Sequence, residues 1–170
     1  MRGLLLALLL LATPAAAADT LDGPMVDRRT PTVRARFAWP QQAAFAAGVV
    51  FHRQPERITC ETVCQIRGWH LQGEAGIAGG QLAFGWTKLV GQHGPRFDVL
   101  SRPYMAFAVR AALLRTWGSS TLAPKERSFA GVEGAWSVAR ISLALSVMRD
   151  LDDDRVGSRW LVGGGLGWGF

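Results

Sequence analysis

Most of the last twelve residues of the sequence alternate between large apolar side chains and glycine. In RWLVGGGLGWGF (159–170), one parity carries the large apolar residues Trp160, Val162, Leu166, Trp168 and Phe170, and the other carries Leu161 followed by four glycines. Successive side chains of a β-strand point to opposite faces of the sheet. The segment therefore predicts a strand with one large apolar face and one nearly bare face.

The same period of two continues through most of the chain. We expect further strands at 43–53, 68–78, 81–90, 104–115, 128–138 and 139–149, separated by segments rich in turn residues. Long polar connections at 118–126 and 150–158 alternate with a tight junction near 138–140. Such asymmetry is typical of barrels with long external loops and short periplasmic turns.

An eighth strand has two candidate positions. It is either VRARFAW (33–39) or the result of splitting 97–117 at Pro103. The first choice makes the connection at 54–66 periplasmic, and the second makes it external. We favour the first, because it needs no hairpin without turn residues, although it implies an unusually long periplasmic turn.

The first 18 residues are typical of a cleaved secretory signal peptide. Arg2 is followed by an apolar run and by Ala16-Ala17-Ala18, which offers small residues at a cleavage site. We expect a signal peptide at 1–18, a flexible polar lead at 19–32 and a barrel domain at 33–170. Export permits a disulfide, and Cys60 and Cys64 are the candidate pair. The sequence has three histidines but no C-x-x-C or H-E-x-x-H pattern, and we therefore expect no metal site.

Composition favours a membrane barrel over a soluble one. The chain is 49% hydrophobic and only 19% charged, and no apolar run beyond the first twenty residues is long enough for a membrane helix. A solvent-facing sheet surface would carry more charge than the Gly-, Ala- and Ser-rich parity found here. Small residues suit a crowded lumen, and the large parity suits lipid.

The final strand, closing on Trp168-Gly169-Phe170, resembles the assembly signal of Gram-negative outer-membrane β-barrel proteins. We therefore expect an all-β, antiparallel, up-and-down transmembrane barrel of about eight strands in the outer membrane. The resemblance implies outer-membrane lipid, lipopolysaccharide and the barrel-assembly machinery as partners. Aromatic residues expected at the membrane interface are Trp69, Trp86, Trp136, Trp160, Trp168 and Phe170.

The lumen-facing parity carries four charged residues, two of each sign, which we expect to form an ion-pair network: Glu74, Arg110, Glu133 and Arg140. His70 and Glu74 share one face of a strand but lie too far apart along it to act as a base and its orienting group. No nucleophile motif is present.

The expected protein is a monomer with a closed lumen and a structural, adhesive or surface-binding role through its external loops. It needs no cofactor and binds no nucleic acid, since the arginines are scattered along the chain. Three alternatives stay open: a lipid A-modifying enzyme, a narrow pore, and a soluble β-sandwich or lipocalin-like barrel in the periplasm.

Overall fold

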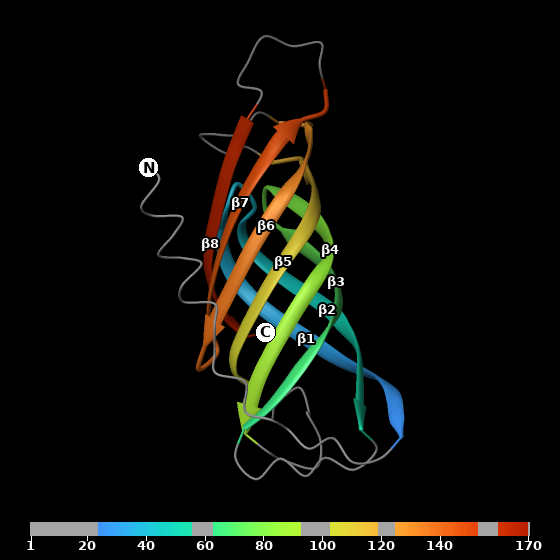
Figure 1. The fold of residues 1–170 in the computed structure, drawn as a ribbon. Coiled ribbons are helices and arrows are strands. Elements are labelled where there is room, and N and C mark those ends of the chain that lie inside the picture. Colours follow the sequence, from blue (N-terminus) through green and yellow to red (C-terminus); the bar gives the residue numbers. More distant parts are fainter. Residues whose placement is uncertain (1–23, 56–62, 93–102, 119–124, 153–159, 170) are drawn as a thin grey trace, which may run out of the picture.

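The structure is a computed structural model in which residues 24–55, 63–92, 103–118, 125–152 and 160–169 are described. These residues form eight strands (Figure 1). The strands are β1 (Met25–Trp39), β2 (Gln42–Pro55), β3 (Val63–Gly76), β4 (Gly79–Gln92), β5 (Pro103–Thr116), β6 (Ser128–Val138), β7 (Ile141–Asp150) and β8 (Trp160–Gly169). None of the described segments is a helix with the length and hydropathy needed to cross a membrane.

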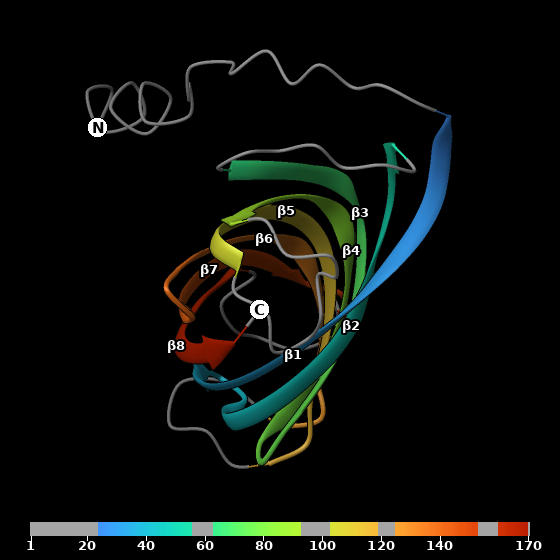
Figure 2. The same cartoon turned by 90° about the horizontal axis from the view of Figure 1, so that it is seen from below.

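Each strand pairs antiparallel with the next along the chain, and β8 pairs with β1 to close the sheet. The view from below shows the strands curving around a common interior (Figure 2). The prediction of eight antiparallel up-and-down strands is therefore confirmed. The closing seam is short, because β1 and β8 are joined by six residue pairs, from Arg34↔Gly169 to Trp39↔Gly164.

Of the two candidate positions for the eighth strand, 33–39 is correct, since it forms the second half of β1. The strand begins earlier than expected, at Met25, so residues 25–32 are not part of a lead without structure. They pair with β2 alone, where Arg53 Nε donates to Asp27 Oδ1 at 2.7 Å. Pro31 lacks an N–H and lies in this one-sided segment, where its missing donor is tolerated.

We call the end where β1 begins and β8 ends the terminal end, and the opposite end the distal end. Strands β2, β4 and β6 end at the terminal end, and β3, β5 and β7 begin there. The backbone of Cys64 in β3 therefore lies at this end, whereas Cys60 lies outside the described residues. The expected alternation is confirmed where it was predicted: the connections β5–β6 and β7–β8 are long, and β6–β7 between them is short. It does not extend to the rest of the sheet. The short turns β1–β2 and β3–β4 lie at the distal end, and only β6–β7 is short at the terminal end.

The β6–β7 turn contains only Ala139 and Arg140, with φ of 47° and 77°. Positive φ at both central residues is the backbone of a two-residue hairpin turn whose twist matches the flanking strands. The strand expected at 139–149 therefore begins two residues later, at Ile141.

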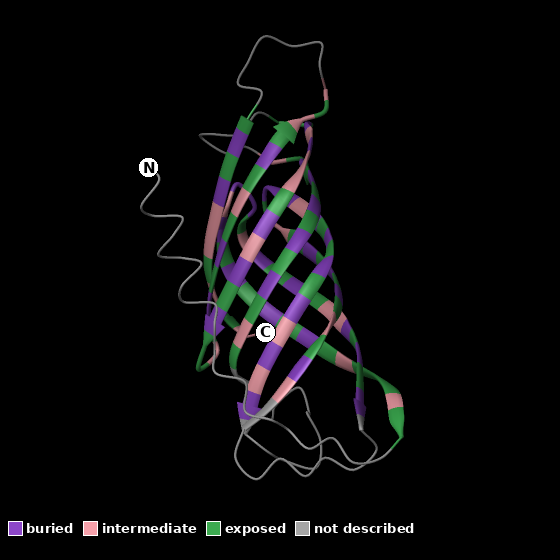
Figure 3. Ribbon diagram, in the orientation of Figure 1, coloured by how far each residue is buried: buried purple, intermediate pink, exposed green. Residues whose placement is uncertain are grey.

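Burial alternates along every strand, as the striped ribbons show (Figure 3). On β1 the inward residues Arg34 and Arg36 are each 5% exposed, whereas the outward Phe37 is 78% exposed. The inward side chains fill the lumen, and the outward ones cover the outer surface.

Candidate functional site

The centre of the lumen holds a network of charged and amide side chains from five strands. We call it the polar centre; it consists of Arg34 and Arg36 from β1, Gln72 and Glu74 from β3, Gln81 from β4, Arg110 from β5 and Glu133 from β6. Each of these residues is at most 7% exposed. Charged groups at such depth are tolerated only when they are paired and hydrogen-bonded.

Glu133 receives most of the hydrogen bonds in the polar centre. Its Oε2 accepts from Arg36 Nη1 and Nη2 at 3.1 Å each and from Gln81 Nε2 at 2.9 Å, and its Oε1 accepts from Arg110 Nη2. Arg36 also reaches Glu74, with 2.7 Å between Nε and Oε2. One guanidinium therefore joins two carboxylates from opposite sides of the barrel.

Glycines of β8 make room for this network. A Cβ on Gly167 would lie 2.5 Å from Arg36 Cβ and 2.6 Å from the carbonyl oxygen of Ala35. Both distances are shorter than an ordinary van der Waals contact, so a side chain at this position would force the two strands apart. The bare face predicted for the last strand thus allows β1, with its two arginines, to pack directly against β8.

Arg34 differs from the other two arginines of the polar centre. Its Nη2 is 3.8 Å from Glu74 Oε2 and 3.9 Å from Glu133 Oε1, and neither its Nε nor its Nη2 makes a hydrogen bond. Three guanidinium groups face two carboxylates here, which leaves the polar centre with one excess positive charge.

His70 lies beside the polar centre. Its Nδ1 is 3.4 Å from Arg110 Nη1, and its Nε2 is 3.0 Å from Thr32 Oγ1. Because a guanidinium can only donate, Nδ1 accepts, and the ring proton is on Nε2, which donates to the Thr32 hydroxyl. This is the reverse of a base that activates a nucleophile, and the contacts support a structural role for His70.

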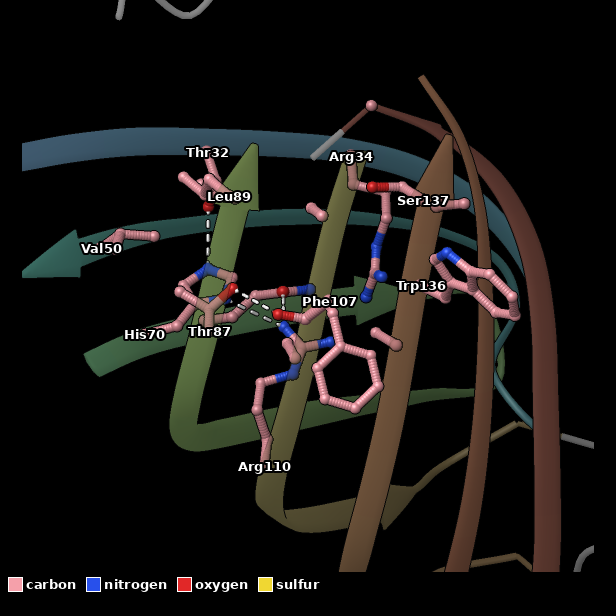
Figure 4. A pocket seen from close by; sticks show the side chains of 16 residues that line it. Thr32, Arg34, Val50, His70, Thr87, Leu89, Phe107, Arg110, Trp136 and Ser137 are labelled. Atoms are coloured by element: carbon pink, nitrogen blue, oxygen red, sulfur yellow. Dashed lines mark hydrogen bonds between the residues drawn. The ribbon is translucent and has the colours of Figure 1, made fainter. Parts of the chain in front are cut away.

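Apolar layers lie on both sides of the polar centre. Toward the distal end, Trp39 packs against a buried cluster of Ala83, Ala112, Leu114, Phe129, Met148 and Leu161. Toward the terminal end, Val50, Ile66 and Leu89 form a second buried cluster. A cavity of about 30 Å³ separates the polar centre from this second cluster (Figure 4).

The structure brings three of the four predicted lumen charges together: Glu74, Arg110 and Glu133. The prediction for Arg140 is wrong. This residue occupies the β6–β7 turn, and the end of β6 alone is about 17 Å from Glu133 at 3.4 Å per residue. The sequence analysis missed Arg34 and Arg36. The alternation of VRARFAW, with both arginines on one parity and Val, Ala and Phe on the other, is the signal that identifies them.

The outer surface forms an apolar band, defined by the outward-facing residues of 31–37, 43–51, 69–75, 82–86, 105–113, 130–138, 141–147 and 160–168. Within these ranges every outward residue is apolar. Five of the six predicted interface aromatics lie in the band, at 56% exposure for Trp69, 37% for Trp86, 43% for Trp136, 61% for Trp160 and 58% for Trp168. Phe170 lies outside the described residues.

Charged side chains begin where the band ends. At its terminal edge, Arg29 lies 5.7 Å over the ring of Phe51, and Arg67 pairs in register with Lys88. At its distal edge the next outward residues of β5 and β7 are Arg115 and Arg149. The aromatic pair Trp69 and Phe84, stacked at 5.4 Å, lies just inside the terminal edge.

Asp150, the last residue of β7, and Asp152 make structural contacts. Arg127 Nη1 donates to Asp150 Oδ2 in a buried ion pair. Asp152 Oδ2 accepts from the backbone N–H of Ser128 at 2.8 Å. These carboxylates fix the distal ends of β6 and β7, and no cluster of potential metal ligands occurs among the described residues.

The candidate disulfide cannot be followed to its atoms, since Cys60 lies outside the described residues and Cys64 is described only in its backbone. No family model, no curated protein and no solved structure matches the chain.

Proposed function

We propose that the chain is a small outer-membrane β-barrel protein with a closed lumen. The observation that carries the proposal is the inverted distribution of polarity: arginines and glutamates are buried, while 28 large hydrophobic side chains of the described residues are exposed. Lipid is the solvent for which an uncharged outer face with buried ion pairs is favourable.

The dimensions of the apolar band support the same environment. From Met105 to Leu113, β5 covers about 27 Å at 3.4 Å per residue. A strand tilt of about 40° reduces this to roughly 20 Å along the barrel axis, close to the band of outer-membrane barrels. Closure of the sheet pairs the strands on both sides over most of the band, as a hydrocarbon environment requires; the exception is the seam, where the described residues 31–33 of β1 and 160–163 of β8 have no partner across it.

The filled lumen supports a structural or surface role over a pore. Apolar layers on both sides of the polar centre leave only a small cavity between them. We assign the contacts with other molecules to the outer surface: lipid and lipopolysaccharide along the band, ligands at the distal loops, and the assembly machinery at β8.

Two leucines of similar exposure allow a sharp test of the membrane location. Leu145, 62% exposed, lies in the middle of β7, whereas Leu151, 54% exposed, follows the end of that strand. In a bilayer, Leu145→Arg places a charge near the midplane and should reduce the unfolding free energy by about 2–4 kcal/mol. Leu151→Arg should change it by less than about 0.5 kcal/mol.

The measurement is urea unfolding in lipid vesicles, together with recovery of each variant in the outer-membrane fraction and comparison of boiled and unboiled samples on a gel. Wild type should refold only with lipid or detergent and should shift in mobility on boiling. A soluble lipocalin-like barrel would refold without detergent and tolerate both substitutions equally, and that result would overturn the proposal.

A further inference from the structure

The cavity beside the polar centre has a wall of one charge sign. Its lining includes Arg34 and Arg110, together with the hydroxyl-bearing Thr32, Ser137 and Ser142. In Figure 4 the side chains of Arg34 and Arg110 extend toward one another from opposite sides. Among the described residues that line it there is no carboxylate.

Several donors at this cavity lack an acceptor. Arg34 is 5% exposed, and its Nε and Nη2 make no hydrogen bond. The hydroxyl of Ser142, on a residue 3% exposed, also has none. A buried donor without an acceptor costs about 1–3 kcal/mol, and more when it is charged.

The charge count points in the same direction. The polar centre carries one positive charge in excess, and among the described residues the carboxylates nearest to Arg34 are nearly 4 Å away. Val50, Leu89 and Ala106 line the apolar side of the cavity. Such a wall lowers the local dielectric constant, which strengthens the attraction between Arg34 and any anion that enters.

From these observations we infer that the cavity is a binding site for one small monovalent anion of the size of chloride. The volume of about 30 Å³ would hold about two waters by the usual measure, which is enough for one halide ion. Arg34 supplies the charge, and Ser142 supplies a hydroxyl donor. The bound anion neutralises the interior, and its role is to stabilise the closed lumen.

The inference does not depend on the membrane location, and it can be tested on purified protein in a neutral detergent. The melting midpoint is measured by gel mobility in sodium chloride, sodium bromide and sodium gluconate at equal ionic strength. Chloride and bromide should raise the midpoint by a few degrees in a saturable manner, whereas gluconate, which is too large for the cavity, should not.

Arg34→Gln should abolish the difference between chloride and gluconate. The matched control is Arg29→Gln, because Arg29 is an exposed arginine of the same strand and lies outside the lumen. It should keep the full chloride effect. Ser142→Ala, which preserves the charge, should weaken halide binding and thus move the saturation to higher concentration.

Diffraction from crystals grown in bromide locates the ion directly. An anomalous peak between Arg34 and Ser142 is the expected result. The inference is overturned if the cavity holds only water, if wild type melts equally in chloride and gluconate, or if Arg34→Gln retains the chloride effect. Should Arg34→Gln fail to fold, the bromide peak in wild type and the Ser142→Ala titration decide the matter.

Discussion

The same substitution at two arginines of β1 should change the unfolding free energy by very different amounts. Arg36→Met removes hydrogen bonds to both carboxylates of the polar centre, at 2.9 Å to Glu74 and at 3.1 Å to Glu133. Glu133 keeps Arg110 and Gln81, but among the described residues Glu74 is left with only the distant Arg34. Removing one partner of a buried ion pair costs about 3–5 kcal/mol, because a charge remains without compensation.

Arg34→Met should cost far less. It removes a cation that donates no hydrogen bond to either carboxylate and leaves two guanidinium groups facing two carboxylates. Replacing a poorly compensated buried charge by an apolar side chain is often neutral or stabilising. We expect an unfolding free energy within about 1 kcal/mol of wild type, or above it.

The assay is urea unfolding in detergent or vesicles, followed by tryptophan fluorescence and by gel mobility. Gluconate replaces chloride in all buffers, so that the loss of a bound anion does not contribute to the Arg34→Met result. Adding Glu74→Gln to Arg36→Met should recover part of the loss, with a coupling energy of about 1–3 kcal/mol. Equal losses for the two arginine variants, or a larger loss for Arg34→Met, would refute the reasoning.

Three further outcomes follow from the packing. Gly167→Leu should prevent closure of the seam and abolish the heat-dependent gel shift. Gly164→Ala should retain the shift, because its new Cβ has its nearest neighbour at 3.4 Å. A normal shift for both variants would contradict this view of the seam. Phe129→Ala, at 2% exposure in the distal cluster, should lower the unfolding free energy by about 3–5 kcal/mol in urea, and a loss below 1 kcal/mol would mean that this cluster is loosely packed. Asp150→Asn breaks a buried ion pair and should lower the melting midpoint clearly, but Asp27→Asn breaks an exposed one and should not; equal shifts would argue against burial as the cause.

The fold was accessible from the sequence because its signal is local and repeated. Alternation along the chain predicts seven of the strands and separates their two faces without any knowledge of pairing. The eighth strand had two candidate positions, and the choice of the inward face needed the composition of the two parities as well. The start of β1 was missed because residues 25–32, including Asp27, Arg28 and Arg29, are mostly exposed. A strand paired on one side only, outside the apolar band, has no apolar face to mark it.

The candidate site was only partly accessible. Glu133 is a lone acid among small residues, and Glu74 shares its parity with His70 and Gln72. Once the polar parity is taken as the inward one, both are placed in the lumen. Arg140 was misplaced because parity was extended through a turn whose two residues, Ala139 and Arg140, include no glycine or asparagine. The missing hydrogen bonds of Arg34 depend on distances across the barrel, which no local pattern contains.

The short seam between β1 and β8 has a consequence for the order of events in assembly. Every other pairing joins neighbours in the chain, so those hairpins can form early, while the seam joins the first strand to the last and must form late. Arg36 meets Glu74 within the sheet β1–β3, but it meets Glu133 of β6 only across the closed lumen. Before closure, Glu133 therefore lacks its hydrogen bonds from Arg36, and the interior of the open sheet is in contact with water. Closure and drying of the interior become one event, and its timing is set by the arrival of β8.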